Sequence, residues 1–411
     1  MAMVKSHRVS DLHPATVKML KKGHPWVTPD KFSLQFPQDA AFIIGRDGRG
    51  EEICLLLNDP SNTKIKAWLW SMRPPLYREV ENFKSELERR LIKAIEKRVQ
   101  LAIAEKRKNY FLVFGEADFL PGLFIQIFNN QLVIQKYSAF WTKKETALLK
   151  CLSNALLNFD FAKKGLAVWL QERNIKRKKG MKKLTLPAFK NIPHQNSCIV
   201  QEFGLDYHIY FQRQYDLGLY SDMAAIREKL NKKMQGASRV LNLFAYTGAY
   251  SLSALKNASE VWSVDLSARY MKWLEENILL NKLDHGHHHS LVQSTEAALS
   301  DFKKNKQTFD FIICDPPSAS SDESGVSNAF KAYNGLLPKL MERLETGGKM
   351  AIFLNTHSLN RKKFENKMSE ILEKNQYKFV IEDSYKLIED CQTLKGFPEG
   401  DYLKGLLIQK K

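Results

Sequence analysis

The sequence predicts an α/β protein whose C-terminal half forms a doubly wound, Rossmann-like sheet, preceded by a β-rich domain and an α+β middle domain. From residue 240 onward, strand-like apolar runs alternate with helix-like segments. The runs are rich in Val, Ile and Phe and show little polar alternation, which is typical of parallel strands covered on both faces. The first run ends at a turn containing Gly248. In doubly wound sheets, ligands bind at this carboxyl edge of the strands.

The expected elements follow from these patterns in chain order. In the C-terminal half, we expect strands at 240–244, 261–264, 290–293, 309–314, 349–354 and 379–383, with helices near 251–256, 269–280, 329–344 and 363–374. A hairpin over 198–211, turning at Gly204, is expected to lead into this half.

The N-terminal half has a different pattern. Short β-prone runs at 41–44, 53–57 and 65–69, separated by turn signals, predict a small β-barrel-like module. Apolar residues at helical spacing predict one long amphipathic helix over 76–106, and further strands are expected at 111–114, 123–128 and 132–137. We therefore expect domains at 1–75, 76–195 and 196–411.

Composition narrows the class of protein. A chain of 411 residues with 44% hydrophobic residues exceeds what one core usually organises. Its five cysteines are isolated and odd in number, with no Cys-x-x-Cys pair, which argues against a disulfide framework and a zinc site. No apolar run is long enough for a bilayer helix, and the first ten residues lack a signal-peptide core. These features predict a cytoplasmic, metal-free protein that is not bound to a membrane.

Positive charge is concentrated in the N-terminal half. Residues 1–195 carry 35 Lys and Arg against 18 Asp and Glu, whereas residues 196–411 carry 28 against 27. Such segregation indicates a polyanionic partner for the first half. The densest cluster is a candidate for phosphate contact, although such a run is also typical of a solvated loop. It consists of Arg173, Lys176, Arg177, Lys178, Lys179, Lys182 and Lys183.

The first strand of the C-terminal half predicts a nucleoside site. A Gly-x-Gly-x-x-Gly pattern is absent around Gly248, which disfavours a nicotinamide or flavin cofactor and suits one with a sulfonium and no phosphate. The rings of Phe244 and Tyr246 suit a cationic neighbour, although both could be core residues. Asp265 ends the second strand, 17 residues beyond Gly248, where a carboxylate accepts ribose hydroxyls or caps the next helix.

The fourth strand ends at Asp315-Pro316-Pro317. Two prolines fix φ and remove two N–H donors, so the loop is stiff and its carbonyls and carboxylate can meet a planar base beside the transferable methyl group. The alternative is a plain turn, which accounts less well for an acid at the end of an apolar strand.

Taken in order, these segments resemble the bacterial large-subunit (23S) rRNA methyltransferases that consist of a PUA domain, a middle domain and a Rossmann-like class I catalytic domain. Residues 22–27 resemble the entry to the PUA module, 115–122 the middle-domain signature and 397–405 the closing strand. In the catalytic half, residues 218–222, 241–248, 264–267, 277–281 and 315–317 fall in the family's order. The series covers most of the chain.

The resemblance implies S-adenosyl-L-methionine as cofactor, ribosomal RNA as partner, and a role for each matching residue. The cofactor-binding candidates are Tyr220, Asp222, Asn242, Phe244, Tyr246, Gly248, Asp265, Leu266, Thr295 and Glu296. The catalytic candidates are Asp315, Pro316, Pro317, Ser318 and Asn355. The RNA-binding candidates are Lys22 and the basic cluster Arg173, Lys176, Arg177, Lys178, Lys179, Lys182 and Lys183.

Two branches of this family methylate different atoms. The cytosine-C5 branch needs a cysteine after the fifth strand to add to the base, and residues 353–358 contain none. The guanine-N7 branch needs no covalent catalyst, since the nitrogen lone pair is already nucleophilic, and residues 270–273, 315–320 and 353–356 are more similar to it. We therefore favour methyl transfer to guanine N7 or another purine nitrogen, with cytosine C5 as the alternative.

Departures from the family pattern keep other hypotheses open. The acid expected after the third strand is replaced by the stretch 293–296, so Thr295 or Glu296 must serve, and the Asp-x-Arg pattern becomes residues 222–224 with Arg227 as the nearest base. A catalytically weak RNA-binding scaffold and an unrelated nucleotide-dependent oxidoreductase therefore remain alternatives. The histidines at 285 and 287–289 cannot all converge on one metal ion. The oligomeric state is left open, with a homodimer among the options.

Overall fold

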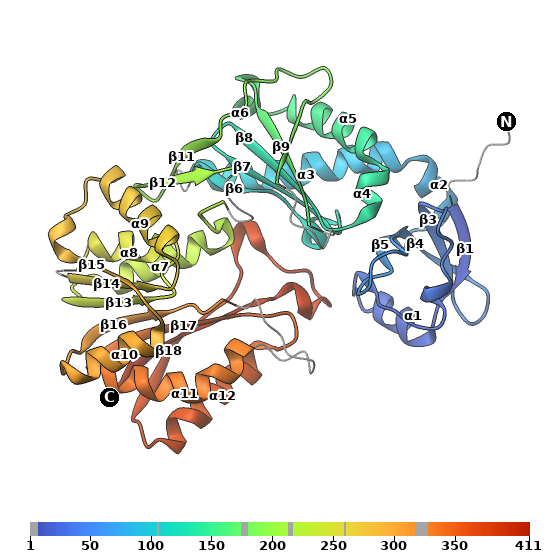
Figure 1. The fold of residues 1–411 in the computed structure, drawn as a ribbon. Coiled ribbons are helices and arrows are strands. Elements are labelled where there is room, and N and C mark those ends of the chain that lie inside the picture. Colours follow the sequence, from blue (N-terminus) through green and yellow to red (C-terminus); the bar gives the residue numbers. More distant parts are fainter. Residues whose placement is uncertain (1–6, 105–106, 174–179, 213–216, 259, 318–327) are drawn as a thin grey trace. The chain divides into compact units, whose positions relative to one another are not determined.

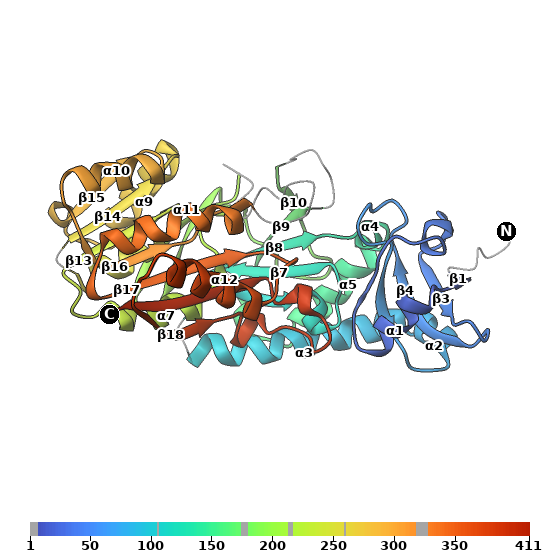
Figure 2. The ribbon, with the colours of Figure 1, turned by 90° about the horizontal axis from the view of Figure 1, so that it is seen from below.

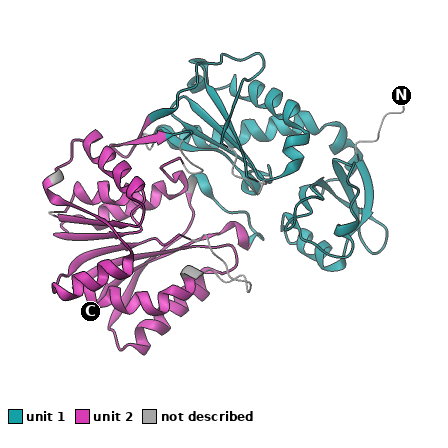
Figure 3. Cartoon of the chain, viewed as in Figure 1, with its two compact units in different colours: residues 1–198, 210–215, 390–397 teal, residues 199–209, 216–389, 398–411 magenta. Residues whose placement is uncertain are grey.

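The computed structural model of the protein describes residues 7–104, 107–173, 180–212, 217–258, 260–317 and 328–411. The chain divides into two compact units (Figure 3). Unit 1 comprises residues 1–198, 210–215 and 390–397, and unit 2 comprises 199–209, 216–389 and 398–411. The chain therefore leaves unit 2 after residue 389, adds a short segment to unit 1 and returns. The three-domain division remains a prediction.

The first sheet of unit 1 has five strands in the order β1-β3-β4-β5-β2. The strands expected at 41–44, 53–57 and 65–69 are confirmed as β3, β4 and β5. The sequence analysis missed β1, which pairs in parallel with β3, and the helix α1 that follows it. The elements are β1 (His7–Asp11), α1 (Pro14–Lys21), β2 (Trp26–Val27), β3 (Phe42–Arg46), β4 (Glu52–Asn58) and β5 (Ala67–Ser71).

The second sheet of unit 1 has the order β10-β9-β8-β7-β6, and helices α3 and α5 pack against it (Figures 1 and 2). The single helix expected over 76–106 is wrong. It is split at Asn82, whose ψ of 10° departs from helical geometry and whose side chain type competes for backbone hydrogen bonds. The elements are α2 (Leu76–Glu81), α3 (Phe83–Ala104), β6 (Asn109–Phe114), β7 (Leu123–Phe128), β8 (Gln131–Lys136), α4 (Ala139–Lys143), α5 (Glu145–Leu156), α6 (Asp160–Lys163), β9 (Ala167–Glu172) and β10 (Lys182–Leu184).

Unit 2 contains a seven-stranded sheet in the order β15-β14-β13-β16-β17-β19-β18. Helices α7 to α9 cover one face and α10 to α12 the other (Figure 1), which confirms the doubly wound prediction. The elements are α7 (Ala224–Lys233), β13 (Arg239–Leu243), α8 (Ala249–Leu255), β14 (Glu260–Asp265), α9 (Ala268–Leu280), β15 (His288–Val292), α10 (Thr295–Lys304), β16 (Phe309–Cys314), α11 (Asn328–Arg343), β17 (Leu344–Asn355), α12 (Arg361–Lys374), β18 (Phe379–Tyr385) and β19 (Leu403–Lys410).

The parallel pairing expected of the sheet is confirmed from β13 to β17 and does not extend to β19. β19 runs antiparallel to both β17 and β18. An antiparallel neighbour needs no helical crossover, and the connection from β18 instead passes through the segment that joins unit 1. As a result, the carboxyl ends of β13 to β17 share one edge with the start of β19, where Asn355 pairs with Leu403.

A hairpin precedes the sheet of unit 2, as expected. It consists of β11 (Ser197–Glu202) and β12 (Leu205–Tyr210), and Phe203 and Gly204 turn the chain with φ of 49° and 76°. These positive values suit the tight turn of a hairpin. The alternation of buried and exposed residues along β11 ends on Glu202, which faces inward.

Candidate active site

The loop between β13 and α8 has a conformation that only the surrounding structure can maintain. Phe244 and Tyr246 have φ of 58° and 53°, and Gly248 has φ of 83°. The left-handed conformation costs a non-glycine residue on the order of 1–3 kcal/mol. A Cβ atom at Gly248 would lie 2.4 Å from the Leu274 Cγ atom, so a side chain is also sterically excluded there. Such strain is typical of functional loops.

Asp265, at the end of β14, holds this loop in place. Its Oδ2 atom accepts a hydrogen bond from the Tyr246 backbone N–H at 3.0 Å, and its Oδ1 atom accepts one from the Ser267 N–H at 2.9 Å. The carboxylate therefore has one fixed orientation at the sheet edge, with further lone pairs available to a ligand. Both alternatives considered for Asp265, a ligand contact and a local capping role, are compatible with this geometry.

Aromatic rings surround Tyr246. Its ring centroid lies 5.5 Å from that of Tyr220, 4.5 Å from that of Tyr270 and 6.5 Å from that of Trp273. Its hydroxyl oxygen accepts a hydrogen bond from the Gly218 N–H at 3.1 Å. Next to Asp265, the Leu266 side chain is 74% exposed. A fixed carboxylate beside exposed apolar and aromatic surface is what a nucleoside requires.

Two carboxylates form the second part of the site. Asp315 follows β16, and Asp222 lies in a short 3₁₀ segment before α7. Burial and, to a smaller extent, the nearby Asp222 raise the pKa of Asp315 to about 7, while Arg227 opposes the shift. The Tyr402 hydroxyl donates a hydrogen bond to Asp222. The carboxyl of Asp315 can therefore hold or release a proton near neutral pH.

A buried ion pair lies behind these carboxylates. The Arg227 guanidinium donates two hydrogen bonds to Glu202 of the β11–β12 hairpin, at 2.7 and 2.8 Å, and both side chains are almost fully buried. Burial alone would lower the pKa of Arg227, but the Glu202 carboxylate raises it, so the guanidinium stays charged. Within the pair, the Arg227 guanidinium acts to lower the pKa of Asp315, and its hydrogen bonds to Glu202 tie the hairpin to α7.

Comparison with known proteins shows which family the sequence around this site matches. Residues 189–382 match the sequence profile of the S-adenosylmethionine-dependent methyltransferase family. This part of the chain is an S-adenosylmethionine-dependent methyltransferase domain. The chain is 29% identical over 324 residues to the ribosomal RNA large subunit methyltransferase YwbD of Bacillus subtilis, covering 78% of this chain and 80% of the relative. It is 27% identical over 391 residues to the ribosomal RNA large subunit methyltransferase I of Erwinia tasmaniensis, covering 94% and 96%.

Solved structures share the fold of the whole methyltransferase chain. A SAM-dependent methyltransferase from Streptococcus mutans superposes with a TM-score of 0.82 at 20% identity, over 98% of this chain and all of that chain. A methyltransferase complexed with S-adenosylhomocysteine superposes over the same shares with a TM-score of 0.83 and 20% identity. At this level of identity, the likeness concerns the fold.

The predicted cofactor residues of the methyltransferase differ in how exposed their side chains are. Asn242 is 1% exposed, and its amide donates to the Ser251 hydroxyl at 2.8 Å. Thr295 is also buried, whereas Glu296, in the first turn of α10, is exposed. Of the two candidates after the third strand, Glu296 is therefore the accessible one. Asn242 supports α8 from beneath, and its cofactor role stays a prediction.

The loop after β17 lies next to the closing strand. Asn355 ends β17, and the buried ammonium of Lys404 donates to the following Thr356 carbonyl at 2.6 Å. Burial lowers the pKa of Lys404 to about 8. Pro316 is buried and Pro317 exposed, while the predicted Ser318 lies outside the described residues. Asp315 and Asn355 thus end adjacent strands, as the sequence predicted.

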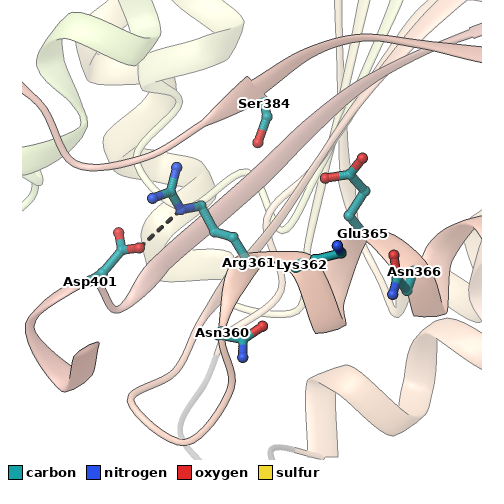
Figure 4. Close-up of a pocket in the computed structure, with 7 residues that line it drawn as sticks. All are labelled: Asn360, Arg361, Lys362, Glu365, Asn366, Ser384 and Asp401. Atoms are coloured by element: carbon teal, nitrogen blue, oxygen red, sulfur yellow. Dashed lines mark hydrogen bonds and ion pairs between the residues drawn. The ribbon is translucent and has the colours of Figure 1, made fainter.

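An open hollow of about 510 Å³ lies on the α12 side of this region (Figure 4). Its charged lining is partly neutralised, because Arg361 donates to Asp401 at 2.9 Å. None of its lining residues has a buried polar atom that lacks a hydrogen-bond partner, so we do not assign a ligand to this hollow. Its lining consists of Asn360, Arg361, Lys362, Glu365, Asn366, Ser384 and Asp401.

The predicted RNA-binding residues lie in unit 1. Lys182 and Lys183 are exposed on the edge strand β10, and the Lys183 ammonium lies 5.7 Å from the Trp169 ring centroid. Lys22 is exposed at the end of α1, and Arg173 follows β9. Lys176, Arg177, Lys178 and Lys179 lie outside the described residues.

In the part of the chain that the structure describes, we next consider the side chains that could bind a metal ion or act as thiolates. There, no three His, Cys, Asp or Glu side chains are grouped for a metal ion. His288 and His289 point to different partners, since one contacts the Ser263 hydroxyl at 2.8 Å and the other stacks on Trp262 at 4.4 Å. All five cysteines are buried, and burial raises the pKa of the Cys314 thiol. Among the same residues, no helix is long and apolar enough to span a membrane.

The sequence analysis missed three side chains of the acidic part of the site. Glu202 and Tyr402 come from the hairpin and from the start of the closing strand, far from Asp315 in sequence. Tyr250 follows Gly248 by two positions, just beyond the segment 241–248 that resembles the family. Arg227 was noted only as the nearest base, without its partner.

Proposed function

We propose that this enzyme methylates a base of large-subunit (23S) ribosomal RNA, with guanine N7 or another purine nitrogen as the acceptor. The observation that carries the proposal is the chemistry of the acceptor side: it has carboxylates, whereas all five thiols are buried. Cytosine-C5 methylation requires an accessible thiolate, while a purine nitrogen needs only positioning. The named relatives, both ribosomal RNA large subunit methyltransferases, support the choice of RNA.

In this proposal, Asp265 accepts the ribose hydroxyls of S-adenosylmethionine, with Tyr246, Leu266 and Glu296 beside the nucleoside. The donor set fits, because the carboxylate is held by two backbone amides and apolar surface is exposed next to it. The bound cofactor supplies an electrophilic methyl group on a sulfonium. The remaining proposed contacts are Tyr220, Asp222, Asn242, Phe244, Gly248 and Thr295.

The chain's own residues then position the acceptor. Asp315, Pro316, Pro317, Ser318 and Asn355 are proposed to contact an extruded base. The stiff proline pair and the Lys404 contact on the loop after Asn355 keep these residues from rearranging. Lys22 and the basic segment 173–183, within a PUA-like domain of residues 1–75 and a middle domain of residues 76–195, are proposed to hold the RNA backbone.

The test is methyl transfer to ribosomal RNA from a strain that lacks the gene. The purified full chain is incubated with labelled S-adenosylmethionine and this RNA, and the digested nucleosides are identified by mass spectrometry. A methylated purine is expected. Labelled 5-methylcytidine would overturn the choice of atom, and the absence of transfer to ribosomal RNA, with intact cofactor binding, would favour an RNA-binding scaffold.

A further inference from the structure

Tyr250 carries a buried hydroxyl that the protein itself does not satisfy. The residue lies in the first turn of α8 and is 8% exposed. Among the described residues, its hydroxyl oxygen has no hydrogen-bond partner. A buried hydroxyl without a partner is unfavourable. Among the described residues, Tyr385 has one as well, so the surroundings of Tyr250 must show whether its hydroxyl meets a partner outside the chain.

The surroundings of Tyr250 identify the kind of partner. Its ring stacks on Phe353 of β17, with centroids 6.1 Å apart and planes 9° from parallel. Burial first, and Asp315 second, raise the pKa of the phenol, so it remains a hydrogen-bond donor. Asp222 and Arg227 also act on it electrostatically. The phenol therefore lies within electrostatic range of both carboxylates, of which Asp315 follows β16 at the predicted methyl-transfer position.

Another buried tyrosine shows how a structural hydroxyl behaves in the same sheet. Tyr333 of α11 is fully buried, and its hydroxyl donates to the Phe353 carbonyl at 2.7 Å. It lies close to the Cys314 carbonyl as well, at 3.3 Å. Among the described residues, the Tyr333 hydroxyl is thus satisfied by the backbone, whereas that of Tyr250 has no partner.

We propose that Tyr250 is a substrate-contacting residue whose hydroxyl donates a hydrogen bond to an acceptor atom of the target base. This inference rests on the proposed function, because it assumes a base in the acceptor site. The complementary chemistry is a base edge that offers an acceptor to the phenol and N–H donors to Asp315. Guanine has this pattern in its O6, N1–H and N2 amino groups, so Tyr250 discriminates by the acceptor and Asp315 by the donors.

The test compares Tyr250→Phe with a matched control, Tyr385→Phe. Tyr385 of β18 is 2% exposed, packs 6.0 Å from the same Phe353 ring and has a hydroxyl without a partner among the described residues. Its neighbouring acids are Asp383 and Glu382 rather than Asp222 and Asp315. Both substitutions remove one hydroxyl oxygen and keep the ring. Comparing them therefore separates the effect of a hydroxyl at the acceptor site from the general effect of losing a buried hydroxyl.

For Tyr250→Phe, we expect kcat/KM for RNA to fall by about 10- to 100-fold while the Kd of S-adenosylmethionine changes less than about twofold. Tyr385→Phe should leave both quantities unchanged. Unchanged kcat/KM in Tyr250→Phe, or a weakened cofactor with normal turnover at saturation, would overturn the assignment. The proposed function fails separately, if the wild-type chain transfers no methyl group to ribosomal RNA.

A second arm tests the atom contacted. Once the methylated position is mapped, a synthetic RNA with 6-thioguanine there replaces the O6 acceptor by a much weaker sulfur acceptor and keeps N1–H and the N2 amino group. Wild type should lose activity on this RNA, and Tyr250→Phe should lose no more than it already has, because both changes affect the same hydrogen bond. Additive losses would mean that the hydroxyl and the O6 atom do not meet. Equal melting temperatures of the variants serve as the folding control.

Discussion

Replacing Asp315 by asparagine should stabilise the folded enzyme at high pH. The pKa of this carboxyl is raised by burial from 3.8 to about 7 in the folded state. The folded state therefore binds the proton more tightly than the unfolded chain, so stability is lost as pH rises from 3.8 to 7 and stays low above that. A pKa shift of about three units corresponds to a loss of roughly 4 kcal/mol in the free energy of unfolding once the folded carboxyl is fully ionised.

The measurable part of this effect lies between pH 5 and pH 8. Over this interval the folded carboxyl ionises at about 7, and the accumulated loss is about 2–3 kcal/mol. Asparagine mimics the protonated form and avoids the loss. The free energy of unfolding of Asp315→Asn minus that of wild type should thus be about 2–3 kcal/mol larger at pH 8 than at pH 5. Turnover should fall, since the carboxylate is proposed to contact the base.

Urea unfolding at both pH values, followed by tryptophan fluorescence, measures this difference. Asp301→Asn is the control, because Asp301 is a surface residue of α10 with a side chain 51% exposed. It makes the same chemical change at an exposed position. If Asp315→Asn shifted the free energy of unfolding equally at pH 5 and pH 8, Asp315 would ionise as an ordinary surface acid, and the electrostatic account of the site would be wrong.

Three further predictions concern other parts of the molecule. Asp265→Ala should weaken S-adenosylmethionine binding in calorimetry by at least about tenfold, through loss of the ribose acceptor and of the loop anchor; an unchanged Kd would remove the assignment. Neutralising Lys182 and Lys183 should reduce the slope of log RNA affinity against log salt by up to about two, and equal slopes would exclude them from the RNA contact. Glu202→Ala should destabilise the enzyme by about 3–5 kcal/mol in urea unfolding by leaving Arg227 buried and unpaired, whereas a loss below about 1 kcal/mol would mean that water reaches the pair.

The fold of unit 2 was largely predictable because its determinants are local. The strands β13, β14 and β16 are apolar runs bounded by clear turns, and their order along the chain dictates parallel neighbours. The antiparallel β19 was not predictable in this way, since its direction depends on a connection that passes through residues 390–397 of unit 1. The sequence analysis missed the break at Asn82, because apolar residues continue at helical spacing on both sides of it.

The two parts of the candidate site differed in predictability for the same physical reason. The nucleoside part is a strand, a turn and the next strand, so Gly248 and Asp265 are close in sequence as well as in space. The acidic part combines the hairpin, α7, α8, β16 and the closing strand, and no spacing rule links Glu202, Asp315 and Tyr402. Their meeting is fixed by the order of strands in the sheet, which brings β16 between β13 and β17. A function that depends on which base enters is therefore encoded mainly in tertiary contacts, whereas cofactor binding is encoded in a short local motif.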